Sequence, residues 1–165
     1  MTPGCAQTAP DVVIGAKDPH AMQLMPAGRA TCLDTSPGQN DHGAAATNAV
    51  RRNAGLPMVQ PNATLARVAA KHACDMAQRG RMTHIGSRTS GPGPRVKAAG
   101  YAPRVTAENI AAGPFSQNRV LAEWTASSGH LANMLIPQVQ DYGIGQAIGP
   151  DGKTRFWAAV YAAPK

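Results

Sequence analysis

Residues 123–135 read Glu-Trp-Thr-Ala-Ser-Ser-Gly-His-Leu-Ala-Asn-Met-Leu, and this stretch decides how the rest of the chain is interpreted. Apolar residues with helical spacing lie on both sides of Gly129: Val120, Leu121 and Trp124 before it, and Leu131, Met134 and Leu135 after it. The pattern predicts a helix that breaks at Gly129 and then resumes. Ser128 can cap the second helix, which would hold His130 in the first turn, near the positive end of the helix dipole. A histidine held there is either a functional group or an ordinary surface residue.

The composition predicts one domain with a core of small side chains. A chain of 165 residues can bury a core, but aromatic residues make up only 4% of it. A net charge of +7 could indicate nucleic acid or an anionic membrane surface as a partner. The basic residues are scattered, however, with Arg51-Arg52 as the adjacent pair, and no basic run alternates with aromatics. We therefore interpret the charge mainly as a source of solubility and expect no nucleic-acid partner.

Residues 1–40 are expected to form an irregular N-terminal arm, because proline and glycine interrupt them repeatedly. Only Val12-Val13-Ile14 could add a short strand. The first residues lack the charged start and apolar run of a signal peptide, so the protein is either cytosolic or has lost its leader. Cys5 follows Gly4, as the lipid-modified cysteine of a bacterial lipoprotein would, although Thr2-Pro3 makes a poor lipobox. In an oxidising compartment, Cys32 and Cys74 could form a disulfide that ties the arm to the domain.

Residues 41–165 are expected to form the domain. A helix is predicted over residues 44–53, and a second one from an N-cap at Asn62 to Gly80, with His72 on its buried stripe as a core histidine. A short helix is expected at residues 95–99. Two strands, residues 142–148 and 154–161, flank a hairpin turn, and Gly143 and Gly145 would allow another backbone to approach closely. Helices followed by antiparallel strands predict an α+β domain with helices packed on a sheet.

Three polar residues, His84, Glu108 and His130, lie in loops or at element ends, away from the apolar stripes. Two imidazoles and a carboxylate are a ligand set for a divalent metal with an open coordination position. The same groups could instead perform acid–base chemistry, with Glu108 orienting a histidine that moves a proton. The spacing of the three residues alone does not distinguish a metal site or an acid–base site from three unrelated loop residues. There is no Cys-x-x-Cys pair for a thiolate zinc site and no Gly-x-Ser-x-Gly motif for a serine nucleophile.

Several short motifs follow one another in an order that resembles a known family. They are Asn48-Ala-Val-Arg-Arg-Asn-Ala-Gly-Leu-Pro57, Met82-Thr-His84, Glu108-Asn-Ile110, Trp124-Thr-Ala-Ser127, Ser128-Gly-His-Leu-Ala-Asn-Met-Leu135, Gly143-Ile-Gly145 and Phe156-Trp157. Residues 42–162 resemble the bacterial SCP-like extracellular domain of the CAP superfamily, which also includes cysteine-rich secretory, antigen 5 and pathogenesis-related proteins. The resemblance implies a three-layer α-β-α sandwich, in which helices flank a central antiparallel sheet.

The resemblance also implies a cleft in which two histidines and two acidic residues gather. His84, Glu108 and His130 match three of these positions, whereas the fourth is Ser127 instead of glutamate, as is common in bacterial members. The missing carboxylate weakens the case for a metal. Because Glu123 lies four residues before Ser127 on the same helix face, we hypothesise that its carboxylate replaces the lost one.

Family resemblance implies an exported protein, extracellular or periplasmic, and makes a Cys32–Cys74 disulfide more expected. The first functional hypothesis is a monomeric binding module whose cleft holds a divalent metal such as zinc, with binding lost as the histidines protonate below about pH 6. The second is a hydrolase in which Glu108 and a histidine activate water or a serine, although we expect no established catalytic activity. The third is lipid or sterol binding. The partner in the cleft is an unknown small molecule, lipid or peptide.

Overall fold

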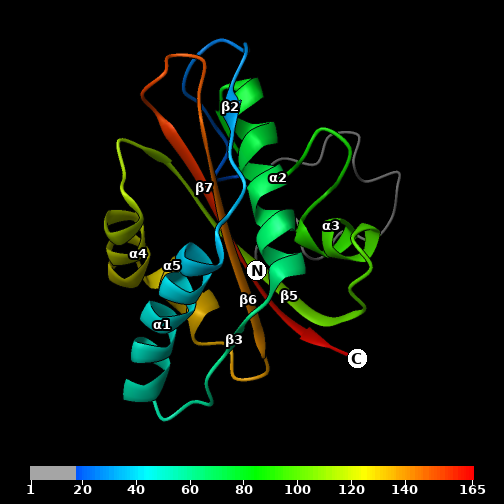
Figure 1. Cartoon of the computed structure of the whole chain (residues 1–165), viewed down its shortest axis with the longest axis vertical. Helices are drawn as coiled ribbons and strands as arrows, with labels where there is room; N and C mark the ends of the chain where they lie inside the picture. Colours follow the sequence, from blue (N-terminus) through cyan, green and yellow to red (C-terminus); the bar gives the residue numbers. More distant parts are fainter. Residues whose placement is uncertain (1–17) are drawn as a thin grey trace.

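The computed structural model describes residues 18–165 (Figure 1). The helices of this part are α1 (Pro37–Asn53), α2 (Ala63–Arg79), α3 (Pro92–Ala98), α4 (Gln117–Ala126) and α5 (Ser128–Met134). Its strands are β1 (Met22–Gln23), β2 (Thr31–Cys32), β3 (Gln60–Pro61), β4 (Arg81–Met82), β5 (Pro103–Gly113), β6 (Asp141–Ile148) and β7 (Arg155–Pro164). The Val12–Ile14 strand and Cys5 lie outside the described residues.

The central sheet has the order β2-β6-β7-β5 and is antiparallel along this path, while β3 pairs with β6 in parallel. The long pairing of β5 with β7 sets the register of the site, since it places Glu108 opposite Val160. The turn between β6 and β7 is the expected hairpin, in which Asp151 Oδ1 accepts hydrogen bonds from the backbone N–H groups of Lys153 and Thr154.

Helices cover both faces of this sheet. Helices α2 and α3 pack on one face, where Leu65, Met76 and Val96 meet Phe156 and Val160. Helices α1, α4 and α5 pack on the other face, around a core that includes Trp124, Tyr142, Trp157 and Tyr161. Figure 1 shows the strands running between these two groups of helices. The expected α+β fold, an α-β-α sandwich with a central antiparallel sheet, is confirmed.

Glycines in β6 let α2 lie directly on the sheet. A Cβ atom added at Gly143 would overlap the backbone of Leu65 and Ala66, and one added at Gly145 would overlap the backbone of Ala69 and Ala70. The close approach expected at these two glycines is therefore confirmed, and α2 is the element that approaches. Asn62 is the N-cap of this helix, with its side chain accepting a hydrogen bond from Leu65 N at 3.0 Å, and Gly80 ends it in a left-handed conformation.

Some element boundaries differ from the predictions. Helix α1 starts at Pro37 instead of residue 44, because Ser36 and Gln39 form a capping box at its start. Helix α3 starts at Pro92 rather than residue 95. The break between α4 and α5 falls at Ser127, and Gly129 lies within α5, so Ser128 is not the cap of that helix.

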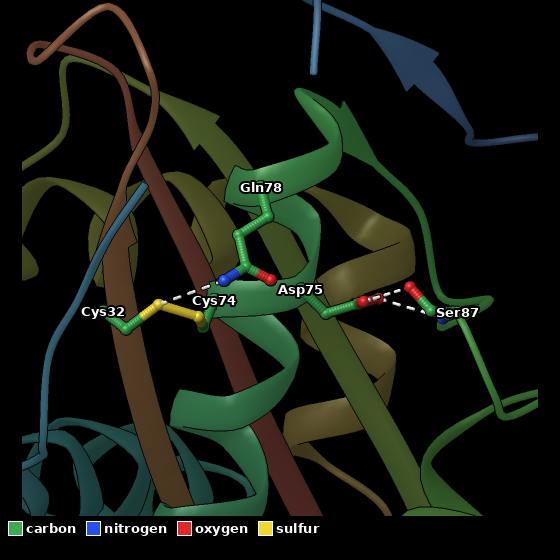
Figure 2. The surroundings of a disulfide bond; sticks show 5 residues. All are labelled: Cys32, Cys74, Asp75, Gln78 and Ser87. Carbon is green, nitrogen blue, oxygen red and sulfur yellow. Dashed lines mark hydrogen bonds between the residues drawn. A yellow bond between two sulfur atoms is a disulfide. The ribbon is translucent and has the colours of Figure 1, made fainter. Parts of the chain in front are cut away.

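The described part of the expected arm is attached to the domain at several points. Strand β1 pairs with β4, and β2 pairs with β6. Cys32 at the end of β2 forms a disulfide with Cys74 of α2, with Cα atoms 5.1 Å apart (Figure 2). On the same turn of α2, the Asp75 carboxylate accepts hydrogen bonds from Ser87 and Arg79. A boundary at residue 40 remains an expectation. Within residues 18–165, no helix combines the length and apolar character that crossing a membrane requires.

Candidate functional site

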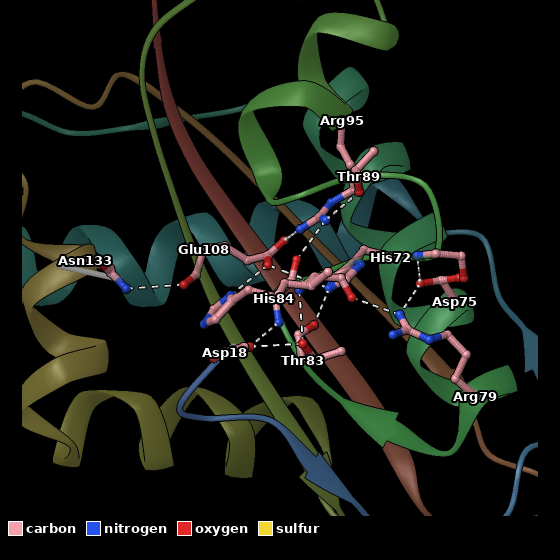
Figure 3. A network of polar contacts seen from close by, with 12 residues as sticks. Asp18, His72, Asp75, Arg79, Thr83, His84, Thr89, Arg95, Glu108 and Asn133 are labelled. Carbon is pink, nitrogen blue, oxygen red and sulfur yellow. Dashed lines mark hydrogen bonds and ion pairs between the residues drawn. The ribbon is translucent and has the colours of Figure 1, made fainter. Parts of the chain in front are cut away.

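Glu108 lies in the middle of β5 and forms the centre of a buried polar cluster (Figure 3). Its Oε1 accepts a hydrogen bond from His84 Nδ1 at 2.9 Å, and its Oε2 accepts one from Arg95 Nη2 at 2.6 Å. Burial alone would raise the pKa of Glu108, but the positive charge of Arg95, together with the neighbouring His72 and the hydrogen bond from His84, outweighs it and holds the pKa well below the ordinary value. The carboxylate is therefore ionised at neutral pH, with both oxygens already engaged.

His72 lies behind Glu108 and is a core residue, as its place on the α2 stripe predicted. Its Nε2 donates to the carbonyl oxygen of Thr83 at 2.8 Å and lies 3.7 Å from Glu108 Oε1. Burial lowers the pKa of His72 to about 4, and the nearby charge of Arg95 acts in the same direction, so the ring is neutral at pH 7. Because the ring is buried and bonded to a backbone carbonyl, we assign this histidine a structural role, although its Nδ1 has no hydrogen-bond partner in the described part of the chain.

His84 follows β4 and is oriented from two sides. Because an ionised carboxylate only accepts, Nδ1 of His84 carries the proton in the bond to Glu108, so the tautomer of the neutral ring has its lone pair on Nε2. The backbone is fixed by Asp18, whose Oδ2 accepts from His84 N at 2.7 Å and from Thr83 Oγ1 at 3.0 Å. His84 is therefore presented in one defined orientation.

His130 lies in α5 and is held by the break between α4 and α5. Its Nδ1 is 2.9 Å from the Oγ of Ser127, the residue at which α4 ends. The amide of Asn109 donates to the His130 carbonyl oxygen at 3.0 Å, and that of Asn133 donates to the Glu108 carbonyl oxygen at 3.2 Å. These two bonds join α5 to the part of β5 that carries Glu108.

His130 is half-buried, and its pKa is lowered. Burial lowers the pKa of His130, and the charges of His84 and His20 lower it further. His20 belongs to the N-terminal arm and was not a candidate in the sequence. Its ring lies edge-on to that of His84, with 6.4 Å between the centroids and 86° between the ring planes. The sequence feature that could have indicated this placement is Asp18, which forms a short turn with His20. Its Oδ1 accepts a hydrogen bond from the backbone N of His20 at 2.9 Å.

Glu123 does not take the place of the missing acidic residue. Its side chain is exposed, and its Oε1 pairs with Arg119 Nε at 2.8 Å across one turn of α4. That ion pair directs the carboxylate along the surface of α4, and its hydrogen bond goes to Arg119 rather than to the polar cluster. Ser127, the residue that stands at the fourth position, instead contacts His130.

The donors available for a metal are two imidazole nitrogens. Within residues 18–165, no group of three or more His, Cys, Asp or Glu side chains is arranged to hold a metal ion. A cavity of about 750 Å³ lies elsewhere, between the segment after β2 and the outer face of α2, with Asp34, Arg67 and Lys71 in its lining. The His/Glu cluster is thus mostly buried and separate from that cavity.

An α-β-α sandwich that brings two histidines around a buried glutamate is the arrangement expected of a CAP domain. Residues 44–161 match the cysteine-rich secretory protein family, CAP. The chain therefore belongs to this family.

Similar proteins occur in several bacteria. The uncharacterized protein YkwD of Bacillus subtilis is 31% identical over 99 residues, which are 60% of this chain and 38% of that protein. An extracellular protein containing an SCP domain from Bacillus anthracis has a TM-score of 0.67 at 25% identity, covering 76% of this chain and 40% of that one. An outer surface protein of Borrelia burgdorferi has a TM-score of 0.70 at 18% identity, covering 84% of this chain and 99% of that one. The chain thus spans well under half of the two Bacillus proteins.

Proposed function

We propose that this chain is an exported CAP-domain binding protein that holds a zinc-like divalent cation between His84 and His130. One observation carries the proposal: in each histidine, Nδ1 is hydrogen-bonded to an oxygen, Glu108 Oε1 for His84 and Ser127 Oγ for His130. When Nδ1–H donates in both bonds, each Nε2 keeps a lone pair for a metal. An oxygen acceptor behind the second ring nitrogen is the usual support of metal-binding histidines.

In this proposal Glu108 and Ser127 orient the ligands and do not bind the metal themselves. Glu108 has both oxygens occupied by His84 and Arg95, so it has little capacity to coordinate an ion. The same occupancy argues against the hydrolase alternative, because a carboxylate held ionised by Arg95 is a poor general base. A metal bound by two imidazoles would keep open positions for water or a ligand, and its affinity would be modest.

Relatives support the export and the choice of ion. Solved relatives include an extracellular protein and an outer surface protein. A structure of NaASP2 was solved with Zn2+, although at 9% identity and a TM-score of 0.51 it shares only the fold with this chain. Imidazole nitrogens also suit zinc better than they suit magnesium or calcium. Two further proposals are independent of the metal. One is that Cys5 carries a lipid, and the other is that the natural ligand of the cleft is a small molecule, lipid or peptide.

The test is calorimetric titration with zinc at pH 7.5, comparing the wild type with His84→Asn and His130→Asn. We expect binding by the wild type and loss of the heat signal in both variants. His42→Asn is the matched control, because His42 lies on α1 and its Nε2 contacts Asn118, away from the cluster. Equal heats in the wild type and all three variants would refute the site.

A further inference from the structure

A groove runs along the outer face of α2, apart from the His/Glu cluster. Its volume is about 750 Å³, which is in the range of sites that hold a small ligand. Residues of α2 line it from Ala63 to Gln78, a length of about 22 Å at 1.5 Å per residue. The opposite wall is formed by residues 32–37, the segment between β2 and α1, which we call the strap. Figure 1 shows this segment descending beside α2.

The strap is attached to α2 at both ends of the groove. At one end Cys32 forms the disulfide with Cys74 of α2, which Figure 2 shows. At the other end, just beyond the strap, the side-chain amide of Asn40 donates to the carbonyl oxygen of Asn62 at 3.3 Å, immediately before α2. Because the two walls are held together in this way, the groove is a preformed feature of the fold, as most ligand sites are.

The floor and the rim of the groove differ in character. Ala66 and Ala70 of α2 are buried and supply small apolar side chains to the floor. The exposed rim carries charges of opposite sign on its two sides, with Asp34 and Asp41 on the side of the strap and α1, and Arg67 and Lys71 on the side of α2. Within residues 18–165 the ion pairs involve other side chains, so these four charges are available to a ligand.

This distribution of charge favours an extended peptide as the occupant. In an extended chain, successive side chains point to opposite sides, so alternate residues would face the two sides of the rim. A peptide of six residues spans about 20 Å, which is close to the length of the groove. An acyl chain, in contrast, gains free energy by leaving water, and an exposed, charged rim offers it little shelter.

We propose that this groove binds an extended peptide, whose basic side chains face the strap and whose acidic side chains face α2. The site goes beyond the proposed function, because it shares no residue with the metal site. The strap precedes residues 44–161, which match the family, so the groove is built partly from a segment outside the matched region.

The experiment is fluorescence anisotropy at pH 7.5 with two labelled, C-terminally amidated hexapeptides of equal composition. Lys-Glu-Lys-Glu-Lys-Glu places one sign of charge on each side of an extended chain, whereas Lys-Lys-Glu-Glu-Glu-Lys places both signs on each side. Because the two peptides have the same net charge, general attraction to a basic protein does not distinguish them. We expect the alternating peptide to bind roughly fivefold more tightly, the worth of one or two exposed charge pairs.

Two double variants locate the binding. Arg67→Gln/Lys71→Gln should weaken binding of the alternating peptide by roughly 3- to 10-fold, because two exposed pairs are lost. Arg52→Gln/Lys97→Gln removes the same charge from exposed positions on α1 and α3, outside the groove, and should bind like the wild type. All four side chains are exposed, so the far-ultraviolet circular dichroism spectra should match that of the wild type.

Three results would overturn the proposal: no binding of either peptide, equal affinity for both, or equal weakening in the two double variants. A further variant separates this groove from the metal site. His84→Asn should bind the alternating peptide as the wild type does, even if it no longer binds zinc. Loss of peptide binding in His84→Asn would place the peptide in the cleft and remove the role of the groove.

Discussion

Arg51 has its guanidinium buried among carbonyl oxygens. Its Nε donates to the carbonyl of Pro57 at 2.7 Å, and its Nη1 donates to those of Met134 and Ile136 at 2.9 and 2.8 Å. Burial lowers the pKa of Arg51, but these acceptors keep the cation satisfied. The side chain thus connects the end of α1 to the turn that follows α5, the helix carrying His130.

Replacing Arg51 with methionine should lower the free energy of unfolding by about 3 kcal/mol or more, because buried carbonyls lose their donors. Its neighbour provides the control: Arg52 is exposed, so Arg52→Met should change stability by less than about 0.5 kcal/mol. Urea unfolding followed by circular dichroism measures both. Similar midpoints for the two variants would show that the carbonyl contacts contribute little.

The candidate residues of the site could be predicted from the sequence, but most of their contacts could not. His84, Glu108 and His130 were singled out as polar residues away from the apolar stripes, and the family resemblance then implied that they share one cleft. Arg95, which supplies the strongest charge beside Glu108, gave no signal, since its bond depends on how α3 sits against β5. Arg51 was interpreted as part of a solubilising charge, although its side chain is completely buried. A residue type shows what a side chain can do, and only the fold determines which groups meet it.

At the scale of elements, the contact between α2 and β6 depends on the absence of side chains. Gly145→Ala would drive a methyl group into the backbone of Ala69 and Ala70, and neither element can move without disturbing the sheet. We expect it to lower the free energy of unfolding by roughly 1–3 kcal/mol, the usual cost of overpacking, or by more because the contact is with backbone.

A second glycine gives the opposite expectation. Gly129 lies in α5, and a Cβ added there would have nothing within 4 Å. Gly129→Ala should therefore raise stability by about 0.5–1 kcal/mol, because alanine favours the helix. The melting temperatures of Gly145→Ala and Gly129→Ala should shift in opposite directions from that of the wild type, down for the first and up for the second. A stable Gly145→Ala protein with an unchanged melting temperature would contradict the packing argument.

Elements with a clear local pattern were predicted well, and those that depend on distant contacts were not. Helix α2 and the β6–β7 hairpin follow from their apolar spacing and turn residues. The first turns of α1 contain Pro37, Gly38 and Gly43, which disfavour helix in isolation. Two features nevertheless start the helix there: the capping box of Ser36 and Gln39, and buried Asn40, whose Oδ1 accepts from Ile144 N at 3.1 Å. The Ser-x-x-Gln spacing was the available signal.

At the scale of the whole molecule, the polar cluster makes stability depend on pH. The pKa of His72 is about 4 in the folded protein and 6.5 in an exposed histidine. As pH falls from 6.5 to 4, the unfolded chain takes up a proton that folded His72 does not, so stability is lost on acidification. The depressed pKa of Glu108 contributes stability above its ordinary pKa that is lost at still lower pH.

We expect the free energy of unfolding to fall by about 3 kcal/mol between pH 7 and pH 4 through His72 alone. His72→Gln keeps a donor for the Thr83 carbonyl but cannot titrate, so it should show a flatter dependence over this range. His42→Gln, an exposed histidine, should follow the wild type. Parallel curves for the wild type and His72→Gln would contradict the assignment. Denaturant titrations at several pH values provide the measurement.

The disulfide has a consequence for chain connectivity. Cys32 and Cys74, separated by 42 residues, close a covalent ring that includes α1 and β3. A peptide bond cleaved inside this ring, for example beside exposed Met58, leaves the fragments linked. Asp18 and His20 precede Cys32 and therefore lie outside the ring, so a cut beside exposed Leu24 would release them while the remainder stays cross-linked. Cleavage before Cys32 would therefore remove the contact of Asp18 with the His84 backbone, whereas cleavage inside the ring would leave every fragment covalently attached.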